Sequence, residues 1–253
     1  MTGPLQNLGI VITRPLDQAK KLSQAISEAG GTPILFPLID IVPLNDYKQF
    51  EQVINDINDY DWAIFISSNA VQNGMPRLLT LGIPAKLEFA AIGPMTSQQL
   101  LGLGVNKVLI PECRFDSESL LSLPEMHAMQ GKKVMIFRGL GGREVLADTL
   151  KARGAQVMFA ECYQRINPQH DVEMLDQLWQ ANKLHGIVIT SSEAMRHLLD
   201  LAKDSGWLKQ VPLFVNHARI AEQPLQMGLT VNIADAPGDE AMTSLIIKLK
   251  HNT

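Results

Sequence analysis

The chain of 253 residues has little cysteine and no long apolar run. Its two cysteines, Cys113 and Cys162, lie 49 residues apart, which excludes a disulfide framework and a zinc ribbon. No apolar run reaches the roughly 18 residues that a membrane-spanning helix needs. The opening residues, MTGPLQNLGIVITRP, have no basic segment followed by a long apolar one. These absences predict a reduced, soluble, cytoplasmic protein.

The chain also lacks an excess of either charge. Lys and Arg total 22 and Asp and Glu total 26, which gives a net charge of −4 without a basic run. Such a balance provides no whole-surface attraction for nucleic acid or for anionic lipid. The apolar share of 46% excludes a disordered chain, and the length is compatible with one large or two small domains.

Several motifs of common enzyme classes are missing as well. No GxxxxGK[ST], HExxH or GxSxG is present, which excludes a P-loop NTPase, a zincin and a hydrolase with a nucleophile elbow. The stretch RGLGGRE at 138–144 does not have the GxGxxG spacing of a dinucleotide site. The six histidines show no close pairing, so no metal site is expected.

Short apolar runs alternate with helical patterns along the whole chain. The runs are almost continuously apolar, which is typical of strands buried on both faces of a parallel sheet. Strands are predicted at Gly9–Thr13, Pro33–Phe36, Trp62–Ile66, Glu88–Ile92, Lys107–Ile110, Lys133–Phe137, Ala155–Ala160, Gly186–Ile189, Pro212–Val215 and Thr230–Ile233. Helices are predicted between them at Leu16–Ala29, Ser97–Leu103, Arg143–Arg153 and Glu193–Leu201. The alternation predicts an α/β protein.

The same signals recur after 124 residues. At this offset Arg14 falls on Arg138, Ser67-Ser68 falls on Ser191-Ser192, and Gly104 falls on Gly228. Each half has the order strand, Arg, helix, Gly, then strand, Ser-Ser, helix, then strand, turn, helix, Gly. An ordered series at one offset is not expected by chance, so we predict two similar α/β lobes.

Two extended stretches with prolines occupy corresponding places in the repeat. They are residues 37–43 and 161–168, and both lie between the second and third strands of their half. Two such segments can pair as a linker between the lobes. The sequence leaves open whether the chain crosses from one lobe to the other there.

Polar residues follow most of the predicted strands, at the place where ligands of parallel α/β sheets bind. These turns are Thr13-Arg14-Pro15, Ser67-Ser68-Asn69-Ala70, Gly93-Pro94-Met95-Thr96-Ser97, Arg138-Gly139-Leu140-Gly141-Gly142-Arg143, Thr190-Ser191-Ser192 and Asn216-His217-Ala218-Arg219. In one interpretation their side chains only cap helices. In the other they bind a ligand with several carboxylates or phosphates, because helix N-termini favour anions.

Tyr163 is the tyrosine that lies in a predicted linker segment rather than in a strand core. One interpretation is packing, with the ring half buried and the hydroxyl hydrogen-bonded. The other is a functional phenol that faces a cleft between the lobes.

These residues together make the chain resemble the uroporphyrinogen-III synthases along its full length. VITRPLDQAKKLSQAISEAGGTPILFPLIDIVPL resembles the opening of that family, DWAIFISSNAV its second block and FAAIGPMTSQQLLGLGV its third. The most specific block is VMIFRGLGGREVLADTLKARGAQVMFAECYQR, and GIVITSSEAM with ARIAEQPLQMG completes the pattern.

The resemblance implies two α/β lobes, each a parallel sheet flanked by helices, joined by a two-stranded linker around an inter-lobe active-site cleft. It implies a discontinuous first lobe of residues 1–37 and 168–253, a second lobe of 44–160, and a linker of 38–43 and 161–167. The chain is then expected to cross between the lobes twice.

The resemblance also implies the reaction. The expected substrate is hydroxymethylbilane, a linear tetrapyrrole with eight carboxylates, which the enzyme cyclises to uroporphyrinogen III with inversion of ring D and loss of water. No cofactor and no metal are expected. Hydroxymethylbilane synthase is the expected donor of the substrate, and a monomer is the default state.

Site residues are carried over from the family one by one. Tyr163 resembles the tyrosine that assists departure of the hydroxyl, and because a phenol is a weak acid we expect a modest effect. Thr96 matches a cleft threonine. The expected substrate-binding residues are Thr13, Arg14, Ser67, Ser68, Asn69, Thr96, Arg138, Gly139, Ser191, Ser192 and Arg219. For Arg14 and Arg138, bracing of the lobe is an equal alternative to carboxylate binding.

One segment departs from the family pattern. Some members have a Gly-Pro-x-Thr-like turn where this chain has Asn216-His217-Ala218-Arg219, so Arg219 or the backbone replaces the expected hydroxyl. Two other function classes stay open: a ligand-sensing module for a polycarboxylate tetrapyrrole, and an anion-binding protein that closes on its ligand without chemistry. Turnover separates both from an enzyme.

Overall fold

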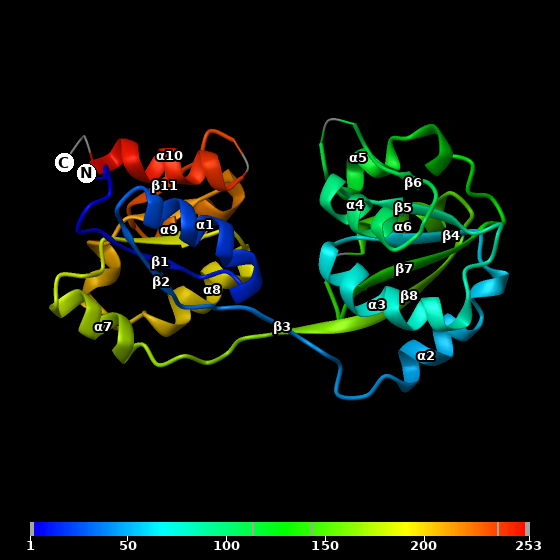
Figure 1. Ribbon diagram of the computed structural model, residues 1–253, viewed down its shortest axis with the longest axis horizontal. Coiled ribbons are helices and arrows are strands. Elements are labelled where there is room, and N and C mark those ends of the chain that lie inside the picture. Colours follow the sequence, from blue (N-terminus) through cyan, green and yellow to red (C-terminus); the bar gives the residue numbers. More distant parts are fainter. Residues whose placement is uncertain (1–2, 113, 143, 237, 251–253) are drawn as a thin grey trace. The chain divides into compact units, whose positions relative to one another are not determined.

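A computed structural model describes residues 3–112, 114–142, 144–236 and 238–250 of the chain. Cys113 and the first residue of the helix predicted at Arg143–Arg153 lie outside these ranges. Contacts divide the chain into two compact units, Met1–Asp40 with Ile166–Thr253 and Ile41–Arg165 (Figure 1). Each unit is described by itself.

The first unit contains a five-stranded sheet in the order β11-β10-β9-β1-β2, whose neighbouring strands are all parallel. The strands are β1 (Gly9–Ile12), β2 (Thr32–Leu35), β9 (Gly186–Ile189), β10 (Leu213–Val215) and β11 (Val231–Ile233). The central strands β10, β9 and β1 are buried at every residue, whereas the edge strands β2 and β11 are partly exposed. This difference explains why the central strands have the most continuous apolar sequences.

Helices flank this sheet. They are α1 (Leu16–Glu28), α7 (Glu173–Gln180), α8 (Ser192–Leu201), α9 (Ala218–Gln226) and α10 (Asp239–Lys250), with a 3₁₀ turn η3 at Gly206–Lys209. Helices α1 and α10 lie against each other, and residues such as Leu22 and Met242 form one core with Ile10 and Phe214 of the strands. Helices α8 and α9 pack on the strands that precede them.

The second unit contains a six-stranded sheet in the order β3-β8-β7-β4-β5-β6. The strands are β3 (Asp40–Val42), β4 (Trp62–Phe65), β5 (Glu88–Ala91), β6 (Val108–Leu109), β7 (Lys133–Gly139) and β8 (Gln156–Ile166). The strands from β8 to β6 are parallel. Strand β3 lies beside β8 at the edge, where the chain passes from one unit to the other.

Two layers of helices enclose the second sheet. One core contains residues of α2 (Lys48–Asn55), α3 (Ser68–Leu81) and α4 (Pro94–Gly102), and the other contains residues of α5 (Ser117–Leu121) and α6 (Val145–Ala152). Short 3₁₀ turns η1 (Ile57–Asp59) and η2 (Pro124–Met126) complete the unit. Three stacked or edge-on rings, Phe50, Phe65 and Phe137, fill the first core.

The two sheets have the same spatial order of strands, but the chain enters that order at a different strand in each unit. Strands β11-β10-β9-β1-β2 correspond to β6-β5-β4-β7-β8, and the strands of each pair begin 124 residues apart to within one residue. The repeat in the sequence is therefore a repeat of structure. In the first unit its last two strands, β1 and β2, come first along the chain.

The main difference from the predicted elements concerns β8. The sequence predicts a strand that ends at Ala160, but β8 continues to Ile166. Its register shifts beside Arg138 and Gly139: Arg138 pairs with Glu161 and Gly139 with Tyr163, so that Cys162 is skipped. The bulge explains why the consecutive residues Cys162 and Tyr163 are both buried in one core.

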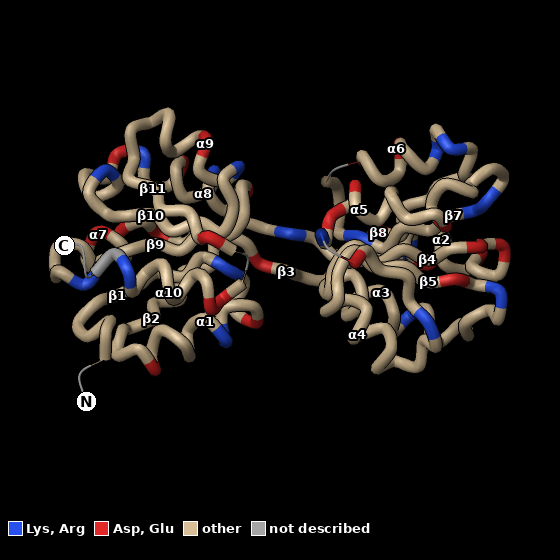
Figure 2. Tube along the Cα trace, turned by 90° about the horizontal axis from the view of Figure 1, so that it is seen from above, with Lys and Arg blue, Asp and Glu red and all other residues tan. Residues whose placement is uncertain are grey.

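The described residues contain no helix that is both long and apolar enough to cross a membrane. Lys and Arg are interspersed with Asp and Glu along both units, as Figure 2 shows, in agreement with the small net charge. The α/β class with parallel sheets flanked by helices is thus confirmed.

Candidate functional site

The turns that the sequence singles out lie at one edge of each sheet. In the second unit the adjacent strands β8, β7, β4 and β5 run parallel, so the residues at their carboxyl ends are neighbours. Tyr163, Gly139 and Ser67 follow one another along this carboxyl edge, and Thr96 comes next in the first turn of α4. The fold therefore brings together the site residues predicted in this unit.

Tyr163 is held from several sides. Its Oη lies 3.2 Å from Ser67 Oγ, and Arg165 Nη2 lies 3.5 Å from the same oxygen. Gly139 lies under the ring, because a Cβ at Gly139 would be 2.6 Å from the ring atom Cε2. Tyr163 is 1% exposed, so its ring is fully buried rather than half buried, and its hydroxyl is hydrogen-bonded to Ser67 as the packing interpretation expects.

Ser67 connects this phenol to a helix N-terminus. It is the N-cap of α3, and its Oγ accepts a hydrogen bond of 3.1 Å from Ala70 N–H. Ser68 and Asn69 form the first turn of α3 and are half buried. The first N–H groups of a helix have no intrahelical partner, so this turn has donors suited to a carboxylate.

Arg138 is turned into its own unit. It is 3% exposed, its Nε donates to Gly139 O at 3.2 Å, and its Nη2 donates to Gly141 O. Its guanidinium also lies 4.5 Å from the centre of the Phe159 ring. Of the two interpretations of Arg138, this geometry favours bracing over carboxylate binding.

Glu161 was not among the residues predicted from the sequence. Its Oε1 accepts a hydrogen bond of 2.9 Å from Gly141 N–H, and Leu140 N–H donates to Tyr163 O at 2.7 Å. Gly141 and Gly142 have φ values of 67° and 108°, which suit glycine. We define Gly139–Gly142 as the β7 loop; side chains on both sides of it hold it in place. In the sequence, the signal for Glu161 is that it directly precedes Cys162, the residue that the register shift skips. That shift becomes known only from the structure.

Thr96 is 6% exposed in the first turn of α4, a helix whose N-cap is Gly93 and whose first residue is Pro94. The helix begins three residues before the predicted start at Ser97, because Pro94 suits the first helical position. Thr96 therefore lies inside the helix rather than in a loop before it.

The first unit has a corresponding edge, formed by the ends of β10, β9 and β1. Ser191 caps α8 and accepts from Glu193 N–H at 3.2 Å and Ala194 N–H at 3.4 Å. Ser192 is exposed at the first position of α8, and Arg219 is exposed in the first turn of α9. Both side chains are therefore accessible to a ligand at this edge.

Thr13 and Arg14 are committed to internal bonds. Thr13 is 1% exposed and its Oγ1 donates to Val188 O at 2.9 Å. Arg14 Nε donates to Thr190 Oγ1 at 3.1 Å, and its Nη1 pairs with Asp239 at the start of α10. The bracing interpretation of Arg14 fits this geometry, and the Thr13 side chain, which was expected to bind substrate, is enclosed instead.

His217 belongs to the turn at 216–219, and it has the helix-capping role that one interpretation gave to the side chains of such turns. It is the N-cap of α9, and its Nδ1 accepts Arg219 N–H at 3.1 Å. The neighbouring Asn216 Oδ1 is buried and has no hydrogen-bond partner among the described residues. The turn that departs from the Gly-Pro-x-Thr-like pattern thus caps its helix with an imidazole.

Cys162, the residue before Tyr163 in β8, has a buried thiol that is not reactive. Burial raises the pKa of its thiol to about 12, and the sulfur contacts the carbonyls of Ala70 and Arg138. The part of the chain that the structure describes has no group of three or more His, Cys, Asp or Glu residues arranged to hold a metal ion.

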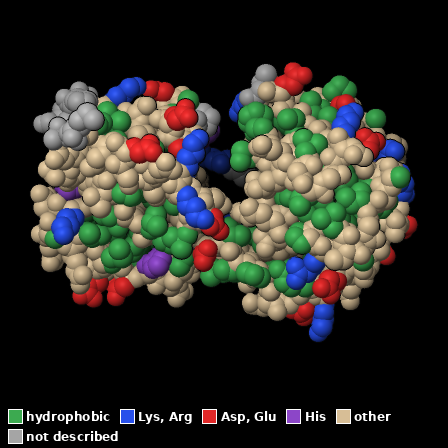
Figure 3. All heavy atoms as spheres, in the orientation of Figure 1, with side chains coloured by type: hydrophobic (Ala, Val, Ile, Leu, Met, Phe, Trp, Pro, Cys, Tyr) green, Lys and Arg blue, Asp and Glu red, His purple; other side chains and the backbone are tan. Residues whose placement is uncertain are grey.

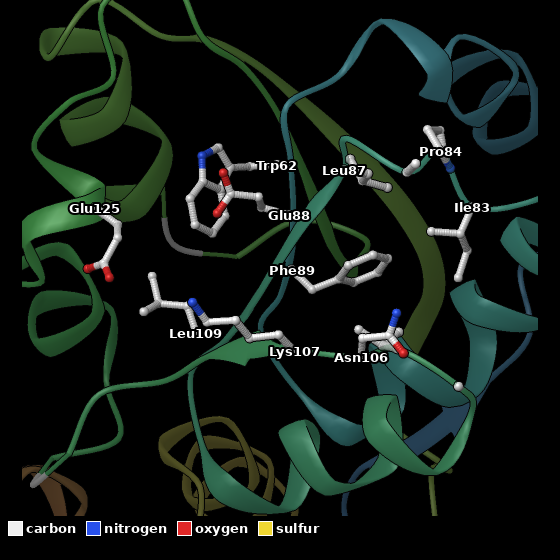
Figure 4. A pocket seen from close by; sticks show the side chains of 13 residues that line it. Trp62, Ile83, Pro84, Leu87, Glu88, Phe89, Asn106, Lys107, Leu109 and Glu125 are labelled. Carbon is white, nitrogen blue, oxygen red and sulfur yellow. The ribbon is translucent and has the colours of Figure 1, made fainter.

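A well-formed pocket of the second unit lies elsewhere. It has a volume of about 330 Å³ and is lined by Trp62, Phe89, Leu109 and others, with Glu88, Lys107 and Glu125 around it (Figure 4). Trp62 and Glu88 are the first residues of β4 and β5, so this pocket is at the amino ends of the strands, opposite the predicted site.

Comparisons with known proteins identify relatives along almost the whole chain. The family model described as uroporphyrinogen-III synthase HemD matches residues 20–244. The uroporphyrinogen-III synthase of Escherichia coli (strain K12) is 32% identical over 241 residues, which cover 93% of this chain and 98% of that protein. That of Salmonella typhimurium is 31% identical over the same shares of the two chains.

Solved structures show the same fold. The uroporphyrinogen III synthase of Thermus thermophilus, as a mutant, has a TM-score of 0.65 at 17% identity and covers 96% of this chain and 98% of its own. The uroporphyrinogen-III synthetase of Helicobacter pylori 26695 has a TM-score of 0.63 at 18% identity, covering 96% and 99%. With the family model and the curated relatives, these likenesses lead to one assignment: the chain belongs to the uroporphyrinogen-III synthase family.

Proposed function

We propose that this chain is a lyase that converts hydroxymethylbilane to uroporphyrinogen III in tetrapyrrole and haem biosynthesis. Besides membership of the family, one observation in the structure supports this reaction. The Tyr163 hydroxyl lies 3.2 Å from Ser67 Oγ at the N-terminus of α3, so a proton donor and an anion-binding turn are adjacent.

Carboxylates of the substrate are bound by helix N-termini in this proposal. The first turns of α3, α4, α8 and α9 offer backbone N–H groups, and Ser68, Asn69, Ser192 and Arg219 add side-chain donors that are at least partly exposed. Fixed backbone dipoles bind carboxylates without an excess of Lys and Arg, which agrees with the net charge of −4.

The chemistry begins with loss of the hydroxymethyl oxygen. The C–O bond breaks and the oxygen leaves as water after gaining one proton. The electron pair of the pyrrole nitrogen forms a C=N bond and the N–H proton is lost, which gives an electron-poor azafulvene. The substituted carbon of ring D then attacks the methylene carbon and forms a spiro intermediate. The bond between the spiro carbon and the methylene that originally joined ring D to ring C then breaks. The unsubstituted α carbon of ring D attacks that methylene and loses its proton, so the macrocycle closes with ring D inverted.

Tyr163 assists the first step in this proposal. Ser67 Oγ already accepts Ala70 N–H, so its own proton can be donated to Tyr163 Oη, which leaves the phenol proton for the departing oxygen. Because Tyr163 is 1% exposed, neighbouring side chains move when the substrate reaches the hydroxyl.

Positioning decides which isomer forms. Without the enzyme the bilane closes directly to the unturned isomer, so the site must hold the chain curled for the spiro attack. A difference of about 2.7 kcal/mol between the two barriers gives roughly a 100-fold preference. Several fixed contacts to carboxylates are sufficient for a difference of this size.

The proposal uses residues of both units for one substrate, in an inter-lobe cleft joined by a two-stranded linker. Residues 1–37 with 168–253 and residues 44–160 are the proposed lobes, with 38–43 and 161–167 as the linker. The pairing of β3 with β8 supports the linker, although β8 belongs to the sheet of the second unit throughout. The proposed form is a cytoplasmic monomer that receives its substrate from hydroxymethylbilane synthase.

A coupled assay tests the function. Hydroxymethylbilane is generated in place, the protein is added, the products are oxidised and the isomers are separated by chromatography. Predominant type III product supports the enzyme. Type I product alone, from protein whose circular dichroism shows a folded chain, overturns it, and tight binding of the bilane without turnover then indicates the sensing module.

A further inference from the structure

Arg165 lies near the carboxyl end of β8, two residues after Tyr163. Side chains two positions apart on a strand point to the same face of the sheet, so both residues lie on one face of β8. Tyr163 is 1% exposed, whereas Arg165 is exposed to solvent. The strand therefore places a solvent-exposed cation beside an enclosed phenol.

The guanidinium of Arg165 lies at the hydroxyl end of the Tyr163 side chain. Its Nη2 is 3.5 Å from Oη, whereas its central carbon is 6.0 Å from the centre of the ring. A second neighbour of the hydroxyl, Ser67 Oγ, is fixed at the N-terminus of α3 by Ala70 N–H. A contact of 3.5 Å made by a long, exposed side chain is weak, so a substrate that approaches the hydroxyl displaces Arg165 rather than Ser67.

Arg165 differs from Arg138, the arginine of the neighbouring strand β7. Arg138 is 3% exposed and donates to the carbonyls of Gly139 and Gly141. On the surface of both units, Lys and Arg side chains are scattered among Asp and Glu, as Figure 3 shows for one view. The exposed guanidinium next to the proposed proton donor is therefore a local feature and not part of a general basic surface.

The bilane has a negative charge close to the oxygen that leaves. Eight carboxylates on four rings give two arms per pyrrole, and the arms occupy the two β carbons, because the α carbons form the links of the chain. The ring that bears the hydroxymethyl group on an α carbon therefore carries a carboxylate arm on the adjacent β carbon. A residue that binds this arm beside Tyr163 also places the departing oxygen beside Tyr163.

Given the function proposed above, on which this inference rests, we propose that Arg165 binds the carboxylate arm adjacent to the hydroxymethyl group and so positions the departing oxygen at the Tyr163 hydroxyl. The guanidinium moves from Oη to the carboxylate, with which its planar fork forms two parallel N–H···O bonds. This movement opens the side of the phenol that Arg165 covers. Ser67 stays in place and keeps the phenol oriented.

The test combines a variant with a changed substrate. In the coupled assay, Arg165→Gln is expected to lower kcat/KM for hydroxymethylbilane about tenfold, through a higher KM and a lower kcat, because the arm is neither bound nor oriented. Arg165→Lys keeps the charge without the fork and should lie between the two. A synthetic bilane with a methyl group in place of this one arm should cost the parent protein about tenfold as well. In Arg165→Gln, the two substrates should react within about twofold of each other.

Lys107→Gln is the matched control, because it removes one exposed positive charge just before β6, at the amino edge of the same sheet. It should keep the parent kcat/KM within about twofold and the tenfold difference between the two substrates. If Arg165→Gln also keeps that difference, or if Lys107→Gln loses as much rate, Arg165 does not bind the arm and the inference is overturned. Type III product from the parent leaves the proposed function standing in either case, and its absence overturns both.

Discussion

At the residue scale, Tyr163 has a hydroxyl group that is hydrogen-bonded to Ser67 and a ring that packs in the core, and a substitution can remove the first while keeping the second. Tyr163→Phe removes the hydroxyl and leaves the ring on Gly139, so we expect kcat to fall about tenfold while the fold stays intact and the melting temperature falls by only a few degrees. Thr96→Ala should lower kcat less, because backbone donors of α4 remain. Single-turnover rates and thermal scans of the two variants provide the comparison; a Tyr163→Phe variant with the parent rate removes the phenol from the mechanism.

Gly139 allows the Tyr163 ring to lie against the backbone. In Gly139→Ala the new methyl group would be 2.6 Å from ring carbon Cε2, so the ring or the β7 loop must shift. We expect a loss of about 1–3 kcal/mol in the free energy of unfolding and a fall in kcat. Gly102→Ala is the control, because that helical site is open within 4 Å; its stability should rise by up to about 1 kcal/mol. Urea titrations of both variants measure the contrast, and equal stabilities would contradict it.

The hydrogen-bond partners of individual side chains could not be predicted from the sequence. That Arg14 and Arg138 occupy equivalent places of the repeat was visible in the sequence, but their bracing roles depend on Asp239 and on the Gly141 carbonyl. Those partners are set by loop conformation and by residues distant along the chain. Thr13 was expected at the substrate for the same reason, and its bond to Val188 across two adjacent strands could not be seen in one dimension.

At the scale of elements, the carboxylate of Glu161 is one of several groups that hold the β7 loop. Glu161 accepts Gly141 N–H at the surface, so Glu161→Ala leaves that N–H to water, removes a link between β8 and the β7 loop, and loosens the support of Tyr163. We expect kcat to fall several-fold with little change in KM, whereas Glu161→Gln keeps an accepting oxygen and most of the rate. The rates of the two variants can be compared in the isomer assay. Equal rates for Glu161→Ala and Glu161→Gln would show that the position of the β7 loop does not affect catalysis.

Strands β4 and β7 are joined at their beginnings by Asp61. Its Oδ2 accepts Lys133 N–H at 2.8 Å, and this hydrogen bond, with Lys132 nearby, lowers the pKa of the carboxyl. A lowered pKa in the folded state stabilises the protein above the ordinary pKa near 4, and the contribution is lost as pH falls through the folded-state pKa.

Asp61→Asn therefore should cost about 1 kcal/mol or less at pH 7 and nothing near pH 2. Free energies of unfolding from urea titrations at pH 7, 5 and 3 measure the convergence of the two proteins. Asp204→Asn, at an exposed residue between α8 and η3, is the control and should leave the difference small at every pH. A constant difference for Asp61→Asn across the range would show that its charge is not responsible.

Element boundaries followed the sequence where periodicity was strong. Strands β1, β4 and β9 were predicted to within one residue, because each is buried on both faces. Residues 161–168 were predicted to be extended, but as a separate linker segment and not as a continuation of β8. The skipped residue puts two consecutive side chains into one core and breaks the pattern by which a single strand is recognised. The packing of Tyr163 depends on that break.

At the scale of the whole molecule, the second unit is one continuous stretch with its own two cores. We expect a fragment of residues 41–165 to fold alone, with cooperative thermal unfolding and dispersed amide resonances. A fragment of residues 166–253 lacks β1 and β2 of its sheet and should not fold by itself. Nuclear magnetic resonance spectra of both fragments distinguish these outcomes, and a well-dispersed spectrum of 166–253 would contradict the expectation.

The order of strands in the first unit has a consequence for synthesis on the ribosome. Strand β1 pairs with β9, whose residues are translated about 175 positions later, while the second unit is completed in between. Strand β1 can pair with β2 soon after both are made, but at about 5–20 residues per second it waits roughly ten to thirty seconds for β9, its neighbour on the other side. During that interval we expect chaperones to bind the nascent N-terminal segment. Depletion of ribosome-associated chaperones should therefore lower the soluble yield of the whole chain more than that of the 41–165 fragment.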